Sequence, residues 1–240
     1  TPAWSAVYTM CDEFCQLLQD ELLVPFGAGS AAQDGAIRVL VLDSRLLLAT
    51  TALRRMLARM RASAEGRRIL SDRPRVSMEA MARAWELPKH TFGGAYADFM
   101  GRRHFSPDDR PPPRFRDCPD EAFVAQRSRE VHDFWHVLFG CPTTVLGELS
   151  LKALEFVQTG LPVGALSLAA AVRLKPHQRR QLFAEQLPWA LRAGRACPDL
   201  ICLYYEEYLE EDLEALRSRW RIVSAPEALR AGKEISSARP

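Results

Sequence analysis

Apolar side chains recur at steps of three and four residues along most of this 240-residue chain. That spacing is typical of amphipathic helices, in which 3.6 residues make one turn. The first such stripe consists of Val7, Cys11, Phe14, Leu18 and Leu22. Later stretches, separated by glycine and proline breaks, predict helices over 120–139, 143–158, 163–173, 177–193 and 200–219. Only residues 37–42 could equally form a strand, so we expect an all-α protein.

Composition shifts suggest how the chain is organised. Glycines at 27, 29 and 35 separate an N-terminal helix and loop, residues 1–35, from the rest. Residues 36–225 are expected to form a single helical domain, and residues 226–240 a C-terminal tail. Within the domain, five prolines crowd residues 105–119. Because each proline fixes φ and removes a backbone donor, we expect that segment to be extended and not helical.

Charge, hydropathy and cysteine spacing exclude several classes of protein. Thirty-two basic and 30 acidic residues give a net charge of +2, too balanced for a general nucleic-acid binder. No run of 18 uncharged apolar residues exists that could span a membrane as a helix. The six cysteines contain no CxxC pair, so neither a zinc finger nor a disulfide scaffold is indicated. We therefore expect a globular protein with no nucleic-acid partner.

The most informative residues are His132, Asp133, His136 and Glu148. On a helix, the two histidines are spaced i and i+4 and share one face, and Asp133 lies beside them. Glu148 follows a Gly-Cys-Pro break, so an antiparallel helical hairpin would return its carboxylate to the level of the histidines. Two imidazoles and two carboxylates predict a metal site, for Zn²⁺ first, with Fe²⁺ and Mn²⁺ also matching by ligand type.

Two other interpretations of the histidines are open at this point. Histidines at i and i+4 are often part of a partly exposed helical face, although the apolar neighbours Phe134 and Trp135 argue that this pair is buried and needs partners. The His-Asp pair also resembles that of HD-type phosphohydrolases, which would require His104 and Asp199 to complete the site. The Pro-rich segment around His104 argues against that arrangement.

The chain resembles the coenzyme Q (ubiquinone) biosynthesis protein 4 family and its mitochondrial homologues. The family signature His-Asp-x-x-His-x(11)-Glu is matched in full by His132, Asp133, His136 and, after eleven residues, Glu148. Similar flanks extend over residues 72–76, 105–108, 127–133, 140–148, 156–162, 187–190 and 203–206. The resemblance covers about residues 65–225, and residues 1–60 match poorly. It implies that His132, Asp133, His136 and Glu148 are zinc ligands.

The resemblance also implies a location and an activity. The expected protein is peripheral on the matrix side of the mitochondrial inner membrane, within a complex of ubiquinone-synthesising proteins. Whether the chain also forms a homo-oligomer is left open by the resemblance. The implied reaction is C1-decarboxylation, simple or oxidative, of 4-hydroxy-3-methoxy-5-polyprenylbenzoate by a carbon–carbon lyase. No general acid and no organic cofactor are indicated. The alternative is a non-catalytic scaffold that binds prenyl lipid and organises the complex, with a structural metal.

A polyprenyl substrate requires an apolar lining. Residues 161–172 are uncharged and rich in small side chains, and basic residues follow at 173, 175, 179 and 180. We expect an apolar channel from the metal site toward a membrane-facing surface formed by residues 161–180. A core helix without a channel is the alternative.

Overall fold

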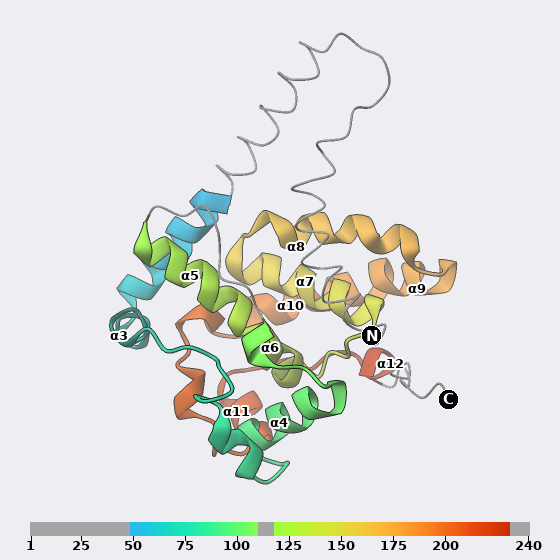
Figure 1. Ribbon diagram of the computed structural model, residues 1–240. Helices are drawn as coiled ribbons and strands as arrows, with labels where there is room; N and C mark the ends of the chain where they lie inside the picture. Colours follow the sequence, from blue (N-terminus) through green and yellow to red (C-terminus); the bar gives the residue numbers. More distant parts are fainter. Residues whose placement is uncertain (1–48, 110–117, 231–240) are drawn as a thin grey trace.

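The computed structural model describes residues 49–109 and 118–230; in these ranges every regular element is a helix and there is no strand (Figure 1). An isolated antiparallel bridge joins Thr91 to Asp212. The predicted all-α class is confirmed. The helix expected within residues 1–35 and the alternative strand at 37–42 lie outside the described residues.

The described chain starts in a helix over residues 49–62. The longer elements that follow are α3 (Ala64–Asp72), α4 (Phe92–Arg103), α5 (Pro119–Glu130), α6 (His132–Phe139), α7 (Val145–Thr159), α8 (Pro162–Leu166), α9 (Pro176–Gln181), α10 (Leu187–Ala196), α11 (Leu213–Arg219) and α12 (Glu227–Arg230). Short 3₁₀ turns connect several of them, and Leu182–Gln186 between α9 and α10 is a π-helix.

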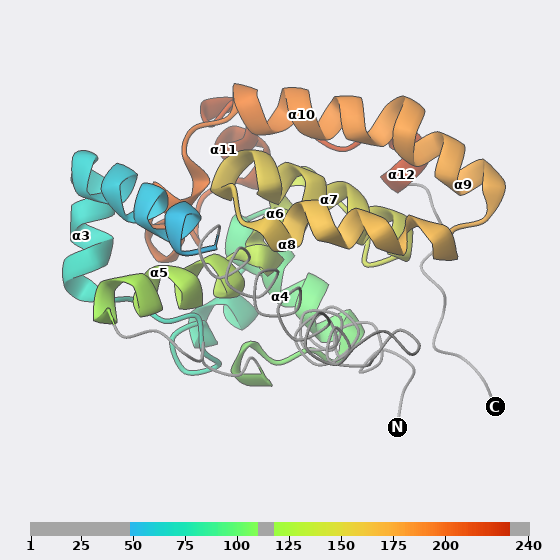
Figure 2. The same cartoon turned by 90° about the horizontal axis from the view of Figure 1, so that it is seen from above.

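Helix α7 lies at the centre of the helical layers. It packs against α10 on one side and α8 on the other, as Figure 2 shows. The contact with α10 is close because Gly194 has no side chain: a Cβ there would lie 3.0 Å from Cγ1 of Val157. Helix α6 packs instead on α4. The two helices that carry the predicted metal ligands, α6 and α7, are therefore each fixed in the core by a different neighbour.

The helix predicted over 120–139 is divided into α5 and α6 at Val131, where ψ is −5°. The backbone ladder is nearly continuous there, since Val131 N–H donates to Arg127 and Trp135 N–H donates to Val131. Helix α6 ends at Gly140, whose φ of 66° places it in the left-handed region that favours glycine.

The prediction of a continuous helix over 200–219 is wrong. Residues 200–207 form two 3₁₀ turns joined by extended backbone, and only Leu213–Arg219 is α-helical. The cause is tertiary, because the backbone of this segment bonds elsewhere. The carbonyls of Leu209 and Glu211 accept from Gly93 and Phe92 at the start of α4, and the carbonyl of Leu203 accepts from Arg127.

Two expected irregular segments are only partly described. In the Pro-rich segment, Pro107–Asp109 is a 3₁₀ turn and Pro119 begins α5, while residues 110–117 lie outside the described residues. In the expected C-terminal tail, residues 227–230 form α12, with Leu229 buried. Just before it, Ala225 N–H donates to the carbonyl of Phe139 at the end of α6.

Candidate metal centre

His132 and His136 occupy the first position and the following turn of α6, and both side chains are buried. Their Nε2 atoms lie 3.1 Å apart, as the i and i+4 spacing predicts. The apolar residues around them bury this face. Phe99 of α4 stacks on the His136 ring, with centroids 5.2 Å apart.

Glu148 reaches the histidines from the first turn of α7. The helix begins at Thr144, whose hydroxyl accepts from Gly147 N–H and so fixes the turn that carries Glu148. The Glu148 carboxylate lies 3.1 Å from Nε2 of His136 and 3.5 Å from Nε2 of His132. The three side chains thus bring ligand atoms within 4.8 Å of one another.

Substituting Gly147 by alanine is expected to disturb this turn. A Cβ at Gly147 would lie 2.0 Å from the carbonyl oxygen of Pro142, so the backbone must move and carry Glu148 with it. We expect a loss of about 1–3 kcal/mol in the free energy of unfolding, measured by chemical denaturation. Gly101→Ala in α4 is the matched control, because a Cβ there meets nothing within 4 Å. Equal stability of the two variants would contradict the prediction.

The other ring nitrogens are also bonded. Nδ1 of His136 lies 3.0 Å from the carbonyl oxygen of Cys141, and Nδ1 of His132 contacts a carboxylate oxygen of Glu155. Both partners are acceptors, so in the neutral rings the protons lie on Nδ1 and both Nε2 atoms are bare acceptors. With both rings neutral, as metal ligation requires, the cluster of two Nε2 atoms and the Glu148 carboxylate is made of acceptors only; a proton on Nε2 of His132 would instead make that atom a donor toward Glu148.

Buried acceptors that converge in this way need a cation or a proton between them. Atoms about 2.1 Å from a tetrahedral Zn²⁺ lie about 3.4 Å from one another. The two Nε2 atoms lie 3.1 Å apart, and the two oxygens of Glu148 lie 3.1 Å from Nε2 of His136 and 3.5 Å from Nε2 of His132, separations close to that value. The donor set therefore fits a divalent metal ion with nitrogen and oxygen ligands.

The electrostatics favour charged carboxylates at the site. Burial alone would raise the pKa of Glu148, but the two histidines together hold it well below its usual range. Burial likewise opposes ionisation of Glu155, yet Lys152 and His132 lower its pKa to about 2. Burial and Lys152 lower the pKa of His132, whereas Glu155 and Glu148 raise it, with a net upward shift. Two carboxylates in this buried region are thus ionised at neutral pH.

The sequence-predicted residues do not all meet. His132, His136 and Glu148 converge; Asp133 is buried in the same turn of α6 but is not one of the three that offer ligand atoms within 4.8 Å. The phosphohydrolase interpretation finds no support. His104 is exposed at the end of α4, and Asp199 is ion-paired with Arg59 at 2.5 Å.

Sequence reasoning missed Glu155 and Lys152. Glu155 lies seven residues after Glu148, which is two helical turns, and this spacing places both carboxylates on one face of α7. That periodicity is the signal by which it could have been found. The carbonyl of Cys141 carries no such signal, because any residue type offers a carbonyl.

A surface cleft of about 250 Å³ reaches His136 from the outside. Its walls come from α4, the end of α6 and the following loop, with Leu213 and Arg230, and they include Phe99 and Arg103. It contains no residue of the 161–180 segment, so it does not open toward the surface expected from the sequence. Also, none of the helices in the described part of the chain is long and apolar enough to cross a membrane.

Fold and site together define an all-α protein with a buried His-His-Glu cluster suited to a metal ion. The chain belongs to the coenzyme Q (ubiquinone) biosynthesis protein Coq4 family, whose model matches residues 31–226. The match therefore begins earlier in the chain than the resemblance expected from the sequence motifs.

Individual relatives agree with this family. The chain is 45% identical over 170 residues to the mitochondrial ubiquinone biosynthesis protein coq4 of Talaromyces stipitatus, covering 70% of this chain and 59% of that protein. It is 42% identical over 178 residues to the protein named mitochondrial COQ4 of Coccidioides immitis, covering 73% and 63%. The chain thus spans about 60% of the length of these curated relatives.

A solved structure shares the fold. A Nostoc punctiforme crystal structure, of a protein provisionally named for ubiquinone biosynthesis, superposes with a TM-score of 0.57 at 22% identity. The match covers 80% of this chain and 90% of that one. At this identity the similarity concerns the helical architecture alone.

Proposed function

We propose that this protein is a metal-dependent carbon–carbon lyase of ubiquinone biosynthesis. Its substrate would be 4-hydroxy-3-methoxy-5-polyprenylbenzoate, from which it removes the C1 carboxyl group. The observation that carries the proposal is the buried set of three converging acceptors, His132, His136 and Glu148, in a chain of this family. A cluster of this kind is costly to bury unless a cation or a proton lies between the acceptors, and a metal ion satisfies all three together.

The proposed ligands are His132, Asp133, His136 and Glu148. Three of them converge directly, and Asp133, only 1% exposed in the same turn, would be the fourth. Zn²⁺ is the proposed ion, and Fe²⁺ and Mn²⁺ suit the same nitrogen and oxygen ligands. When bound, the ion supplies a positive charge that polarises a substrate oxygen.

The protein's own contribution is to hold the two imidazole rings and to exclude water. The Cys141 carbonyl fixes the His136 ring from outside the cluster, and Phe99 covers its face. In the simple reaction the bond from C1 to the carboxyl carbon breaks, CO₂ leaves, and C1 takes a proton. An oxidative course would instead place a hydroxyl on C1 and needs an external oxidant, because Zn²⁺ has no redox chemistry.

The proposal is tested with a short-chain prenylated substrate carrying ¹³C in its carboxyl group. Wild-type protein loaded with metal, together with the other proteins of its complex, is expected to release labelled CO₂. Glu148→Gln is expected to release none while keeping its helical fold. Glu185→Gln, at an exposed position, is the matched control and should match the wild type. Release by Glu148→Gln at the wild-type rate would contradict the proposal.

A non-catalytic scaffold is the second candidate, and the burial of the cluster favours it. Glu148 is only 8% exposed and His136 1%, so a metal there could serve to join α6 to α7. In that case Glu148→Gln would lower the thermal stability and the assembly of the complex along with any turnover. Loss of turnover at unchanged stability favours the enzyme.

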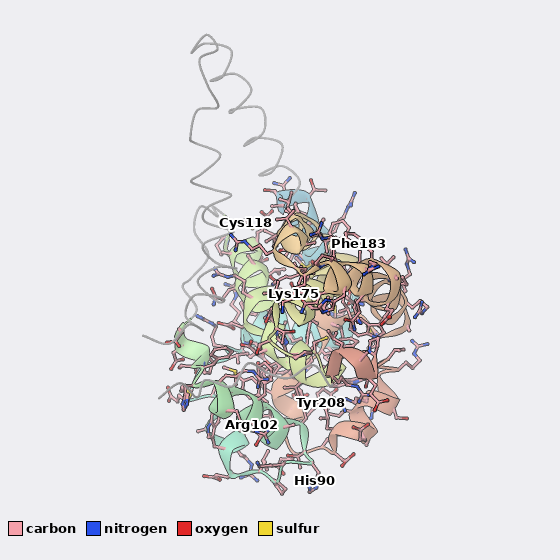
Figure 3. All side chains as sticks on the ribbon, turned by 90° about the vertical axis from the view of Figure 1, so that its right-hand side faces the viewer. His90, Arg102, Cys118, Lys175, Phe183 and Tyr208 are labelled. Carbon is pink, nitrogen blue, oxygen red and sulfur yellow. The ribbon has the colours of Figure 1, made fainter. Side chains whose placement is uncertain are left out.

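We also propose a peripheral location on the matrix side of the mitochondrial inner membrane, with other ubiquinone-biosynthesis proteins and a second copy of the chain as partners. The relatives' names include the word mitochondrial. The surface of α8 to α10 supports the membrane contact. Val172 is 75% and Phe183 54% exposed. Figure 3 places Phe183 and Lys175 far from His90.

Exposed basic residues follow Val172, so anionic lipid headgroups are the expected contact. Replacing Arg179 and Arg180 by glutamate is expected to weaken binding to anionic vesicles, by about 1 kcal/mol or more for each charge removed. Liposome flotation measures it. The double variant Arg83→Glu with Lys89→Glu, at two exposed positions before His90 in the sequence, is the control with the same change in charge. If the two double variants floated equally well with anionic vesicles, the surface of α8 to α10 would not be the membrane contact.

A further inference from the structure

The His132 ring of α6 lies between two carboxylates that both belong to the neighbouring helix, α7. Glu148 faces its Nε2 at 3.5 Å, and Glu155, two turns later on α7, contacts its Nδ1. Both glutamate residues are buried, each 8% exposed as a whole residue. The two glutamates therefore meet opposite edges of one imidazole.

Lys152 distinguishes the two carboxylates. Its Nζ lies 2.8 Å from Oε2 of Glu155, so that oxygen is already bonded and only Oε1 is directed at His132. The Lys152 side chain is 16% exposed and Glu155 11%, so this ion pair is largely shielded from water. A carboxylate held in this way is fixed on the outer edge of the ring, away from the converging ligand atoms.

We infer that Glu155, held by Lys152, is the positioning residue of the metal centre: it keeps the proton of His132 on Nδ1 and directs Nε2 at the ion. This inference rests on the proposed metal site and adds the group that determines its affinity. A carboxylate bonded to the outer nitrogen of a ligating histidine fixes the ring orientation and increases its basicity. His136 has only the neutral carbonyl of Cys141 in the same position, so His132 is the more strongly directed ligand.

The test uses Zn²⁺ titration of the full chain against a competing chelator. Glu155→Ala is expected to weaken Zn²⁺ binding by about 10- to 100-fold. Glu155→Gln should recover most of the affinity, because its amide oxygen still accepts from Nδ1–H, and it keeps the buried volume filled. Glu79→Ala, at an exposed position, is the control with wild-type affinity.

A second measurement does not depend on metal. In the metal-free protein, at a pH high enough to keep the imidazole rings neutral, ¹⁵N NMR is expected to show the Nδ1–H tautomer at His132, and a mixture of tautomers in Glu155→Ala. If the wild type bound no Zn²⁺, the proposed metal site would fail, and this spectrum would still decide the role of Glu155. An unchanged tautomer in Glu155→Ala overturns the inference. So does a loss of Zn²⁺ binding in Glu155→Gln as complete as in Glu148→Gln, since Glu155 would then be a ligand itself.

Discussion

His136→Ala is expected to weaken metal binding on the order of 100- to 1000-fold. Structural zinc sites bind with about 10–16 kcal/mol, so one ligand of four accounts for roughly 2.5–4 kcal/mol. His136 supplies an Nε2 that lies 3.1 Å from Nε2 of His132 and 3.1 Å from Oε1 of Glu148, and no movement of the shorter alanine replaces it. Titration with Zn²⁺ against a chelator measures the change.

His90→Ala is the matched control for this variant. His90 is exposed, does not belong to the cluster, and lies at the lower end of the molecule in Figure 3. We expect it to bind Zn²⁺ as tightly as the wild type does. If His136→Ala bound Zn²⁺ as tightly as the wild type does, the ion would have to bind at another site.

Glu206→Ala is expected to be the most destabilising single substitution that we propose, at about 3–5 kcal/mol. The Arg127 side chain is 0% exposed, and both of its terminal nitrogens contact the Glu206 carboxylate. Without Glu206, the buried guanidinium keeps no anionic partner among the described residues, only the carbonyl of Leu203 at 3.3 Å and the face of the Tyr205 ring. An uncompensated buried charge is the cause of the loss.

The partner variant should cost less. Arg127→Met leaves Glu206 alone, but that side chain is 15% exposed and can reach water. Glu207→Ala is the control, because Glu207 pairs with Arg68 where both side chains are exposed, and such pairs contribute up to about 1 kcal/mol. Denaturation in guanidinium chloride ranks the three. If Arg127→Met lowered the free energy of unfolding more than Glu206→Ala does, this account would be contradicted.

The cluster could be predicted from sequence because its geometry is local. The spacing of His132 and His136 is fixed by the helix itself, and the break before Thr144 limits where Glu148 can lie. The all-α fold class could be predicted for the same reason, because each amphipathic stripe is visible in the spacing of apolar residues within one short segment.

The features that sequence reasoning missed depend on contacts far along the chain. Residues 200–212 carry helical periodicity, yet their carbonyls bond to α4 and to Arg127, 76 residues from Leu203. The two turns between Glu148 and Glu155 are readable in the sequence, but which carboxylate faces which nitrogen depends on how α7 packs beside α6. The cleft at His136 is likewise formed by α4 and α6 together.

The central claim is that the acceptor cluster of α6 and α7 binds a metal ion, and anomalous diffraction tests it most directly. Crystals of protein purified without chelator would be measured on both sides of the zinc absorption edge, with the iron and manganese edges alongside. We predict one anomalous peak about 2.0–2.2 Å from Nε2 of His132, Nε2 of His136 and an oxygen of Glu148. A metal peak elsewhere, or a cluster closed by a proton with His132 bonded directly to Glu148, would contradict the account.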